Sequence, residues 1–222
     1  MNIVSYALWG TDPTYCVGAL RNVELVAKHY GPAWTCRFYV FPSAAGMTDA
    51  LTRAGAQVEM VTRYSEEEGL FARLDVVSDP TVQRFIVRDT DSRPSGREAE
   101  LVRAWVRSGK MVHAINDHHR HTAPLMGGMW GAVNAGLPWF ASDINEWLAS
   151  VRAGTAPYIR TAAGRYGRYS DQSFLGMIVW PKVRMNCLMH DTLSRADMRE
   201  SNYFIGQQWH VIDGKETPIW VR

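Results

Sequence analysis

TVQRFIVRDTDSR, the stretch from residue 81 to residue 93, places a run of apolar residues directly before two aspartates. The apolar part predicts a buried strand over Thr81–Arg88. In sheets of parallel strands, ligands bind at the carboxyl ends of the strands. Asp89 and Asp91 therefore stand where we expect a functional site.

The residues before this stretch alternate between predicted strands and predicted helices. Strands are expected at Ile3–Leu8, Cys36–Phe41 and Val58–Val61, and helices at Gly18–His29 and Met47–Ala54. This order is typical of a sheet of parallel strands with helices on its faces. The fold class that we predict is therefore α/β, with a mixed but mostly parallel central sheet.

The residues after the stretch continue the pattern less regularly. We expect a strand at Met111–Ile115, helices at Arg97–Val106 and Ile144–Val151, and a further helix at Gln172–Ile178. Gly154–Ser170 is predicted to be a loop. Because the chain has 222 residues without a repeat or an evident linker, we expect one domain over residues 1–222.

The composition is that of an ordinary globular protein, with 46% hydrophobic and 21% charged residues. A net charge of +2 gives no reason to expect a nucleic-acid partner. No apolar run reaches the roughly 18 residues of a membrane span, and the first residues lack the pattern of a signal peptide. Cys16, Cys36 and Cys187 lack CxxC spacing, which predicts free buried thiols in a cytoplasmic protein. The oligomeric state is left open.

Asp89-Thr90-Asp91 is the first candidate site. In an extended segment the side chains of residues i and i+2 point to the same side, so both carboxylates can hold one hard divalent cation. Such a cation can neutralise a diphosphate leaving group. The alternative is a capped turn before the helix expected at Arg97. The position after an apolar strand, and the neighbouring arginines Arg88 and Arg93, favour the ligand-binding interpretation.

Four histidines, His113, His118, His119 and His121, form a second candidate. Their spacing matches neither an HExxH motif nor a Cys/His zinc finger. We therefore expect a loop that lines a substrate site, with a zinc site as the alternative.

Three further segments each leave two interpretations open. Gly127 and Gly128 let the backbone approach a ligand closely, or they form a tight turn packed under Trp130. Asp171 caps a helix, or it serves as a general base or an acceptor ligand. His190 is a neutral metal ligand, or a histidine near the end of a strand.

Taken in order, these segments resemble a family of small bacterial and viral glycosyltransferases with the GT-A fold. The resemblance spans about Ile3 to Gly206. RDTDSR followed by RE is more specific than a lone DxD triplet, and the fixed order of the other segments adds weight. The segments that carry it are SYALWGTDPTYCVGALRN (5–22), FARLDVVSDPTVQRFIVRDTDSR (71–93), REAELVRAWVRSGKMVHAINDHHRH (97–121), GGMWGA (127–132), DQSFL (171–175) and HD (190–191).

The resemblance implies roles for the residues that match the family pattern. Asp89 and Asp91 would bind the metal and the sugar nucleotide, and His190 would complete the metal site. Asp171 would face the acceptor, and the Gly127-Gly128 segment would lie under the donor sugar. Arg73, expected on the strand before DxD, is assigned to the nucleotide end.

Two departures from the family pattern concern the acceptor side. Asn116 stands where the pattern often has Arg, and His119 stands where Pro is usual. Acceptor identity is therefore left open by the resemblance.

The resulting hypothesis is a glycosyltransferase that moves a hexose-like sugar from a nucleoside diphosphate donor, UDP favoured, to a glycan or other hydroxyl acceptor, with Mn²⁺ or Mg²⁺. Asp171 is the expected base, and Asp117 is the next candidate. Tyr6 and Trp9 face the nucleotide or pack in the core. The donor-side residues are Tyr6, Trp9, Arg73, Arg88, Asp89, Thr90, Asp91, Arg97, Gly127 and Gly128, and the acceptor-side residues are His118, Trp130 and Asp171.

Two alternatives to this hypothesis remain. The first is a metal-dependent phosphotransferase or hydrolase built on the same aspartates and histidines. The second is a non-catalytic sugar- or nucleotide-binding module, to which nine tryptophans and nine tyrosines are suited.

Overall fold

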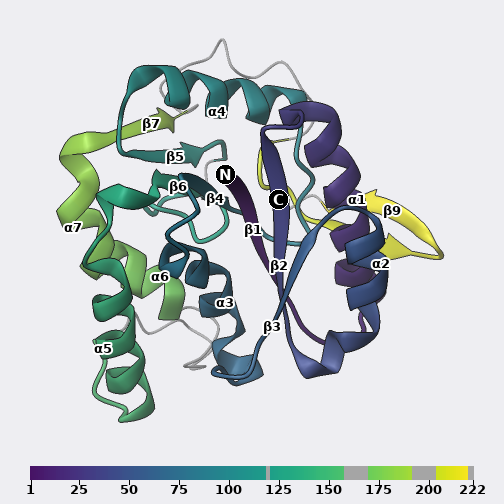
Figure 1. Ribbon diagram of the computed structural model, residues 1–222, viewed down its shortest axis with the longest axis horizontal. Coiled ribbons are helices and arrows are strands. Elements are labelled where there is room, and N and C mark those ends of the chain that lie inside the picture. Colours follow the sequence, from purple (N-terminus) through teal and green to yellow (C-terminus); the bar gives the residue numbers. More distant parts are fainter. Residues whose placement is uncertain (119–120, 158–169, 192–203, 220–222) are drawn as a thin grey trace.

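The central feature of the computed structural model, which describes residues 1–118, 121–157, 170–191 and 204–219, is a seven-stranded sheet in the order β3-β2-β1-β4-β6-β5-β7 (Figure 1). β6 runs antiparallel to both of its neighbours, and the other pairs are parallel. The mixed, mostly parallel sheet is thus confirmed. Its strands are β1 (Asn2–Leu8), β2 (Trp34–Val40), β3 (Gln57–Met60), β4 (Arg84–Val87), β5 (Val112–Asn116), β6 (Trp130–Val133) and β7 (Cys187–Asp191).

Helices cover both faces of this sheet. On one face pack α1 (Pro13–Tyr30), α2 (Thr48–Arg53) and α4 (Gly96–Ser108). On the other pack α3 (Gly69–Ala72), α5 (Phe140–Arg152), α6 (Ser170–Phe174) and α7 (Trp180–Val183). Figure 1 shows α1 and α2 at the right and α5, α6 and α7 at the left.

The strand side chains alternate between these two apolar layers, as the period of a strand requires. On β4, Phe85 and Val87 pack toward α5 and α6, whereas Ile86 packs toward α1 and α4. The two layers cover the sheet, and Asp89 and Asp91 lie beyond the end of β4.

A small hairpin of β8 (Trp209–Ile212) and β9 (Lys215–Pro218) lies against α1, where the Val211 backbone NH approaches the Thr14 Oγ1 at 3.4 Å (Figure 1). Nothing in the sequence pattern predicted this hairpin. In the described part of the chain, no helix has both the length and the apolar character of a membrane span.

Several predicted boundaries are corrected by local contacts. The first helix begins at Pro13 rather than Gly18, because the Asp12 side chain accepts a hydrogen bond from the Thr14 NH at 2.8 Å and caps it. The strand expected at Thr81–Arg88 is confined to β4, because Asp79 instead holds Thr81 in a turn. Arg73 is not on a strand: it begins a 3₁₀ turn over Arg73–Ser78 that follows α3.

The three cysteines are free, as expected. Only Cys36 is buried, whereas Cys16 and Cys187 are half-buried, so the prediction of three buried thiols is wrong in part.

Candidate active site

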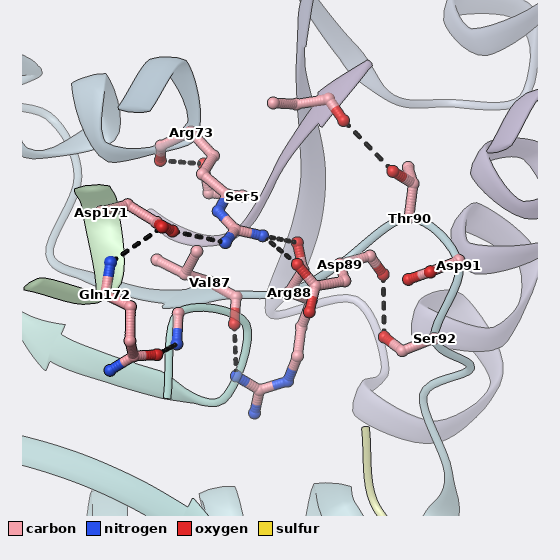
Figure 2. A network of polar contacts seen from close by, with 12 residues as sticks. Ser5, Arg73, Val87, Arg88, Asp89, Thr90, Asp91, Ser92, Asp171 and Gln172 are labelled. Carbon is pink, nitrogen blue, oxygen red and sulfur yellow. Dashed lines mark hydrogen bonds and ion pairs between the residues drawn. The ribbon is translucent and has the colours of Figure 1, made fainter. Parts of the chain in front are cut away.

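Arg73 joins two aspartates that come from distant parts of the chain. Its guanidinium contacts the Asp89 carboxylate beyond the end of β4, and its Nη2 lies 3.1 Å from the Asp171 Oδ2 in α6. The Arg73 backbone is itself held in place, because its carbonyl accepts a 2.6 Å hydrogen bond from the Ser5 Oγ on β1. Figure 2 shows Arg73 between the two carboxylates.

Burial strengthens the electrostatic interactions between Arg73 and the two carboxylates. Arg73 is only 3% exposed. Its burial acts to lower the pKa of the guanidinium, but the Asp89 and Asp171 carboxylates outweigh that effect and raise the pKa, so the cation persists. The pKa of Asp171 is raised, first by its own burial and then by the Asp89 charge, against the opposing effect of Arg73. One cation thus serves two carboxylates.

Asp91 is a further buried carboxylate beside Asp89. It is 5% exposed, and burial followed by the charge of Asp89 raises its pKa to about 6. The Asp89 side chain, by contrast, is 44% exposed. The site therefore has one open carboxylate and one covered carboxylate, with fewer cationic groups than anionic ones.

The backbone of the DxD segment forms a turn and not the extended segment that we expected. The Ser92 NH and Oγ both donate to the Asp89 carbonyl, at 3.1 and 2.8 Å. Thr90 turns away from the aspartates, since its Oγ1 donates to the Ala7 carbonyl on β1 at 3.2 Å. This commits the Thr90 side chain, assigned from the sequence to the donor, to holding the turn (Figure 2).

The two glycines before β6 approach these carboxylates closely. A Cβ at Gly127 would lie 2.8 Å from the Asp171 Oδ2 and 3.0 Å from the Arg73 Nη2, and a Cβ at Gly128 would overlap the Asp89 carboxylate. Only glycine permits this approach. The glycine pair therefore forms a tight turn against the carboxylates, and its position beside a ligand stays a prediction.

Gln172 fixes this glycine turn, a role that sequence reasoning missed. Its Oε1 accepts from the Gly127 NH at 3.0 Å, and its Nε2 donates to the Leu125 carbonyl at 2.5 Å. The available signal was its position next to Asp171. Asp171 lies inside the first turn of α6, where its Oδ1 accepts from the Gln172 NH at 2.8 Å, so it does not cap the helix as a residue before it would.

Arg88 does not point toward a ligand. It is 1% exposed, and its Nε donates to the Glu98 Oε1 at 2.7 Å under α4. Tyr30 also donates to that Glu98 oxygen, at 2.5 Å. The donor-binding assignment of Arg88 is thus corrected, because a buried ion pair already satisfies its charge.

Two aromatic residues assigned to ligands also lie in the core. Tyr6 is fully buried and stacks on Phe38 with ring centroids 4.8 Å apart, so its packing interpretation holds. Trp130 is fully buried against Phe85, with centroids 5.3 Å apart, which corrects its assignment to the acceptor. Trp9 is half-buried at the end of β1 and packs over Gly69.

Asp117 and its neighbours form a separate polar group. Asp117 pairs with Arg97, and its Oδ2 accepts from the Ile205 NH at 2.7 Å. The His118 ring stacks on Phe204 at a centroid distance of 4.2 Å. His119 lies outside the described residues. These contacts give Asp117 and Arg97 a role in holding the segment around Ile205.

His190 lies on β7, with its ring 5.0 Å from the ring of His113. His113 in turn stacks on Trp105 of α4. Among the described residues, no three His, Cys, Asp or Glu side chains form a group that could hold a metal. The structure thus does not assemble His190 with the two aspartates into the predicted metal site.

Asp89 and Asp91 nevertheless fit a hard divalent cation. They supply carboxylate oxygens, the donors that Mg²⁺ and Mn²⁺ prefer. Asp89 is open to solvent, and the glycine turn keeps bulk away from its carboxylate. A cation here would also offset the repulsion between the carboxylates that helps to raise the pKa of Asp91.

No protein-family model matches the sequence, and no curated protein matches it. Solved structures do match. An active-site mutant of LgtC, and the galactosyltransferase LgtC in complex with donor and acceptor sugar analogues, each give a TM-score of 0.54 at 12% identity. The alignments cover 86% of this chain and 73% and 74% of those chains.

A glucosyl-3-phosphoglycerate synthase from Mycobacterium tuberculosis, in complex with Mn²⁺, UDP and phosphoglyceric acid, gives a TM-score of 0.48 at 10% identity, over 82% of this chain and 78% of that chain. The likeness to LgtC shows the fold: the chain has the GT-A architecture, as expected.

Proposed function

We propose that the chain is a glycosyltransferase that moves a hexose-like sugar from a nucleoside diphosphate donor, with UDP favoured, to an acceptor hydroxyl, with Mn²⁺ or Mg²⁺ as cofactor. One observation carries this proposal. Arg73 holds Asp89 and Asp171 together directly beside the Gly127-Gly128 turn, at the carboxyl end of β4. LgtC, which shares this fold, is a galactosyltransferase that binds donor and acceptor sugar analogues, and we extend sugar transfer to this site.

Asp89 and Asp91 would hold the divalent cation. When bound, the cation supplies positive charge to the diphosphate and stabilises it as the leaving group. Asp89 is the accessible carboxylate, and Asp91 supports it from beneath the surface. Arg73 keeps Asp89 in position without neutralising the whole site, because it divides its charge with Asp171.

Gly127 and Gly128 would leave room for the donor sugar beside the carboxylates. Trp9, half-buried at the end of β1, is the aromatic residue that we assign to the nucleotide end. Binding at these points holds the anomeric carbon near Asp171. Positioning of this kind, together with stabilisation of the charge on the diphosphate leaving group, would supply most of the rate enhancement.

Asp171 would face the acceptor. Its carboxylate is fixed on both oxygens, by Arg73 on Oδ2 and by the Gln172 NH on Oδ1. In an inverting reaction it takes the proton of the attacking hydroxyl. In a retaining reaction it orients the acceptor. Its raised pKa makes it a better proton acceptor than an ordinary aspartate.

A donor screen tests this proposal directly. UDP- and GDP-sugars are incubated with the protein and Mn²⁺, and the release of nucleoside diphosphate is measured with and without simple glycan acceptors. We expect metal-dependent release from one donor. Phosphoester hydrolysis without any sugar donor would instead identify a phosphotransferase or hydrolase. Sugar binding that survives replacement of both Asp89 and Asp91 by Asn, without turnover, would identify a binding module.

A further inference from the structure

The β8–β9 hairpin is attached to the DxD turn by its backbone. The Trp209 NH donates to the Asp91 carbonyl at 2.7 Å, and an antiparallel bridge pairs Ser92 with Gln208. These contacts join residues that lie far apart in the chain. The backbone of Gln208 is therefore fixed next to Asp91.

An ion pair strengthens this attachment. Arg93, which directly follows the turn, contacts the Glu216 Oε1 on β9 through Nε and Nη2, both at 2.7 Å. The Arg93 Nη1 also donates to the Thr90 and Ser92 carbonyls, at 3.0 and 2.8 Å. Arg93 thus bonds the hairpin and the DxD turn at the same time.

The Gln208 side chain reaches the carboxylate of the turn. Its Nε2 lies 3.0 Å from the Asp91 Oδ2, and the residue is exposed to solvent. A glutamine amide carries an acceptor oxygen and a donor nitrogen at the same distance from the backbone. A half-turn of the amide exchanges the two atoms, so the oxygen can occupy the place that the nitrogen has here.

We propose that Gln208 supplies a side-chain oxygen ligand to the divalent cation held by Asp89 and Asp91. The inference rests on the proposed function, which introduces that cation. Two carboxylates leave an octahedral cation short of ligands, and amide oxygens are suitable additional donors. Within the described residues, no His, Cys, Asp or Glu forms a group of three with this pair, whereas Gln208 already contacts Asp91.

The amide orientation then depends on the cation. Without it, the NH₂ group faces the Asp91 carboxylate and donates to it. With it, the carbonyl oxygen faces the cation, because an NH₂ group would meet it with positive partial charge. Glu216 acts as a positioning residue, since it holds β9 to Arg93 without contacting the cation.

Two substitutions separate a ligand from a simple hydrogen-bond donor. Gln208→Met keeps the length of the side chain but has no oxygen, and Gln208→Glu keeps an oxygen but cannot donate to Asp91. Binding of Mn²⁺ alone is measured by electron paramagnetic resonance of the free ion. We expect Gln208→Met to weaken Mn²⁺ binding about tenfold, and Gln208→Glu to bind Mn²⁺ at least as tightly as the unsubstituted protein.

Either of two results overturns the inference. The first is that Gln208→Met binds Mn²⁺ as the unsubstituted protein does. The second is that Gln208→Glu weakens binding as much as Gln208→Met does, as expected if Gln208 serves only as a hydrogen-bond donor. Gln57→Met is the matched control, because Gln57 accepts from Arg37 between β2 and β3, and its Mn²⁺ binding should be unchanged. Thermal unfolding in EDTA checks that each variant is folded. Gln208 is exposed, so its substitution is expected to leave the fold intact.

Other variants distinguish a failure of this inference from a failure of the proposed function. If Asp91→Asn abolishes Mn²⁺ binding and Gln208→Met does not change it, only the role of Gln208 is wrong. If the unsubstituted protein binds no Mn²⁺, the cofactor of the proposed function is wrong and the inference falls with it. If His190→Ala weakens Mn²⁺ binding and Gln208→Met does not, the additional ligand is His190 and not Gln208.

Discussion

Arg73 is the residue on which the arrangement of the site depends, because it lies between a carboxylate 16 positions away and another 98 positions away. Its guanidinium offers donors in a planar fork, so one side chain bonds both carboxylates at once. Lysine has a single compact charge and cannot span the same two partners.

Arg73→Lys should therefore reduce sugar transfer by about tenfold or more, with a loss of stability. Replacing one member of a buried ion pair leaves its partners uncompensated, at a cost of about 3–5 kcal/mol when the charge is removed entirely, and less when lysine keeps it. Turnover assays and thermal unfolding are the measurements. Arg53→Lys, at an exposed position of α2, is the control. Full activity and stability in Arg73→Lys would show that the bridge is dispensable.

Asp171 tests the acceptor side of the proposal. Asp171→Asn should leave donor binding and folding intact but reduce transfer by roughly a hundredfold or more, because the carboxamide cannot take a proton. Arg73 keeps Asp89 as its partner, and burial raises the pKa of Asp171, so neutralising Asp171 is expected to change the stability little. Calorimetry with the donor and transfer to the true acceptor are measured together. Normal transfer would return Asp171 to a structural role and make Asp117 the next candidate.

The raised pKa of Asp91 predicts that the stability of the metal-free protein, measured in EDTA, depends on pH. Its pKa rises from 3.8 to about 6 on folding, through burial and then the Asp89 charge, so the folded state binds the proton more tightly than the unfolded state. Stability should therefore fall as the pH rises from about 4 to 6. Asp91→Asn lacks this loss, and should unfold at a higher temperature than the unsubstituted protein at about pH 7.5 but not at about pH 4. Parallel pH curves for the two proteins would contradict the raised pKa.

At the scale of elements, the turn before β6 contributes to the site because its backbone lies against the Asp89 carboxylate. A Cβ at Gly128 would overlap the Asp89 carboxylate, so Gly128→Ala must displace either the turn or the aspartate. We expect Gly128→Ala to weaken Mn²⁺ binding and transfer. Gly46→Ala is the matched control, because a Cβ there meets nothing within 4 Å. Mn²⁺ titrations of both variants decide the matter: equal binding in Gly128→Ala and Gly46→Ala would remove the turn from the site.

The helices and strands of the first half could be predicted from sequence because each has its own periodicity and end signals. The expected helix at Met47–Ala54 is close to α2, and the expected strand at Ile3–Leu8 lies within β1. β6 and the β8–β9 hairpin could not be predicted, because short segments are stabilised by their partners and carry little periodicity of their own.

The candidate site was predictable only in part. The order of the motifs singled out Asp89, Asp91, Asp171 and the glycine pair, and the structure brings these residues close together, while their functional roles stay predictions. The sequence did not predict burial: Arg88 and Trp130 proved to lie in the core, and Asp91 and Asp171 are buried as well. Arg88 pairs with Glu98 ten positions later, a contact that only the packing of α4 on β4 creates. The roles of Gln172 and Gln208 likewise depend on tertiary contacts.

At the scale of the whole molecule, one sheet collects the site. Asp89 follows β4, Arg73 follows α3, Asp171 comes from α6, and the hairpin covers the DxD turn. The GT-A architecture, shared with LgtC, explains why segments so far apart in sequence meet. The single-domain organisation, the cytoplasmic location and the role of His190 stay predictions.

The central claim is that Asp89 and Asp91 bind a nucleoside diphosphate through a divalent cation. Calorimetric titration with UDP in Mn²⁺ and in EDTA tests it most directly. Two carboxylates without a cation repel a diphosphate, so we predict binding at least about tenfold tighter in Mn²⁺, and its loss in Asp89→Asn. GDP serves as the comparison for the base. Equal affinity for UDP in Mn²⁺ and in EDTA would contradict the account.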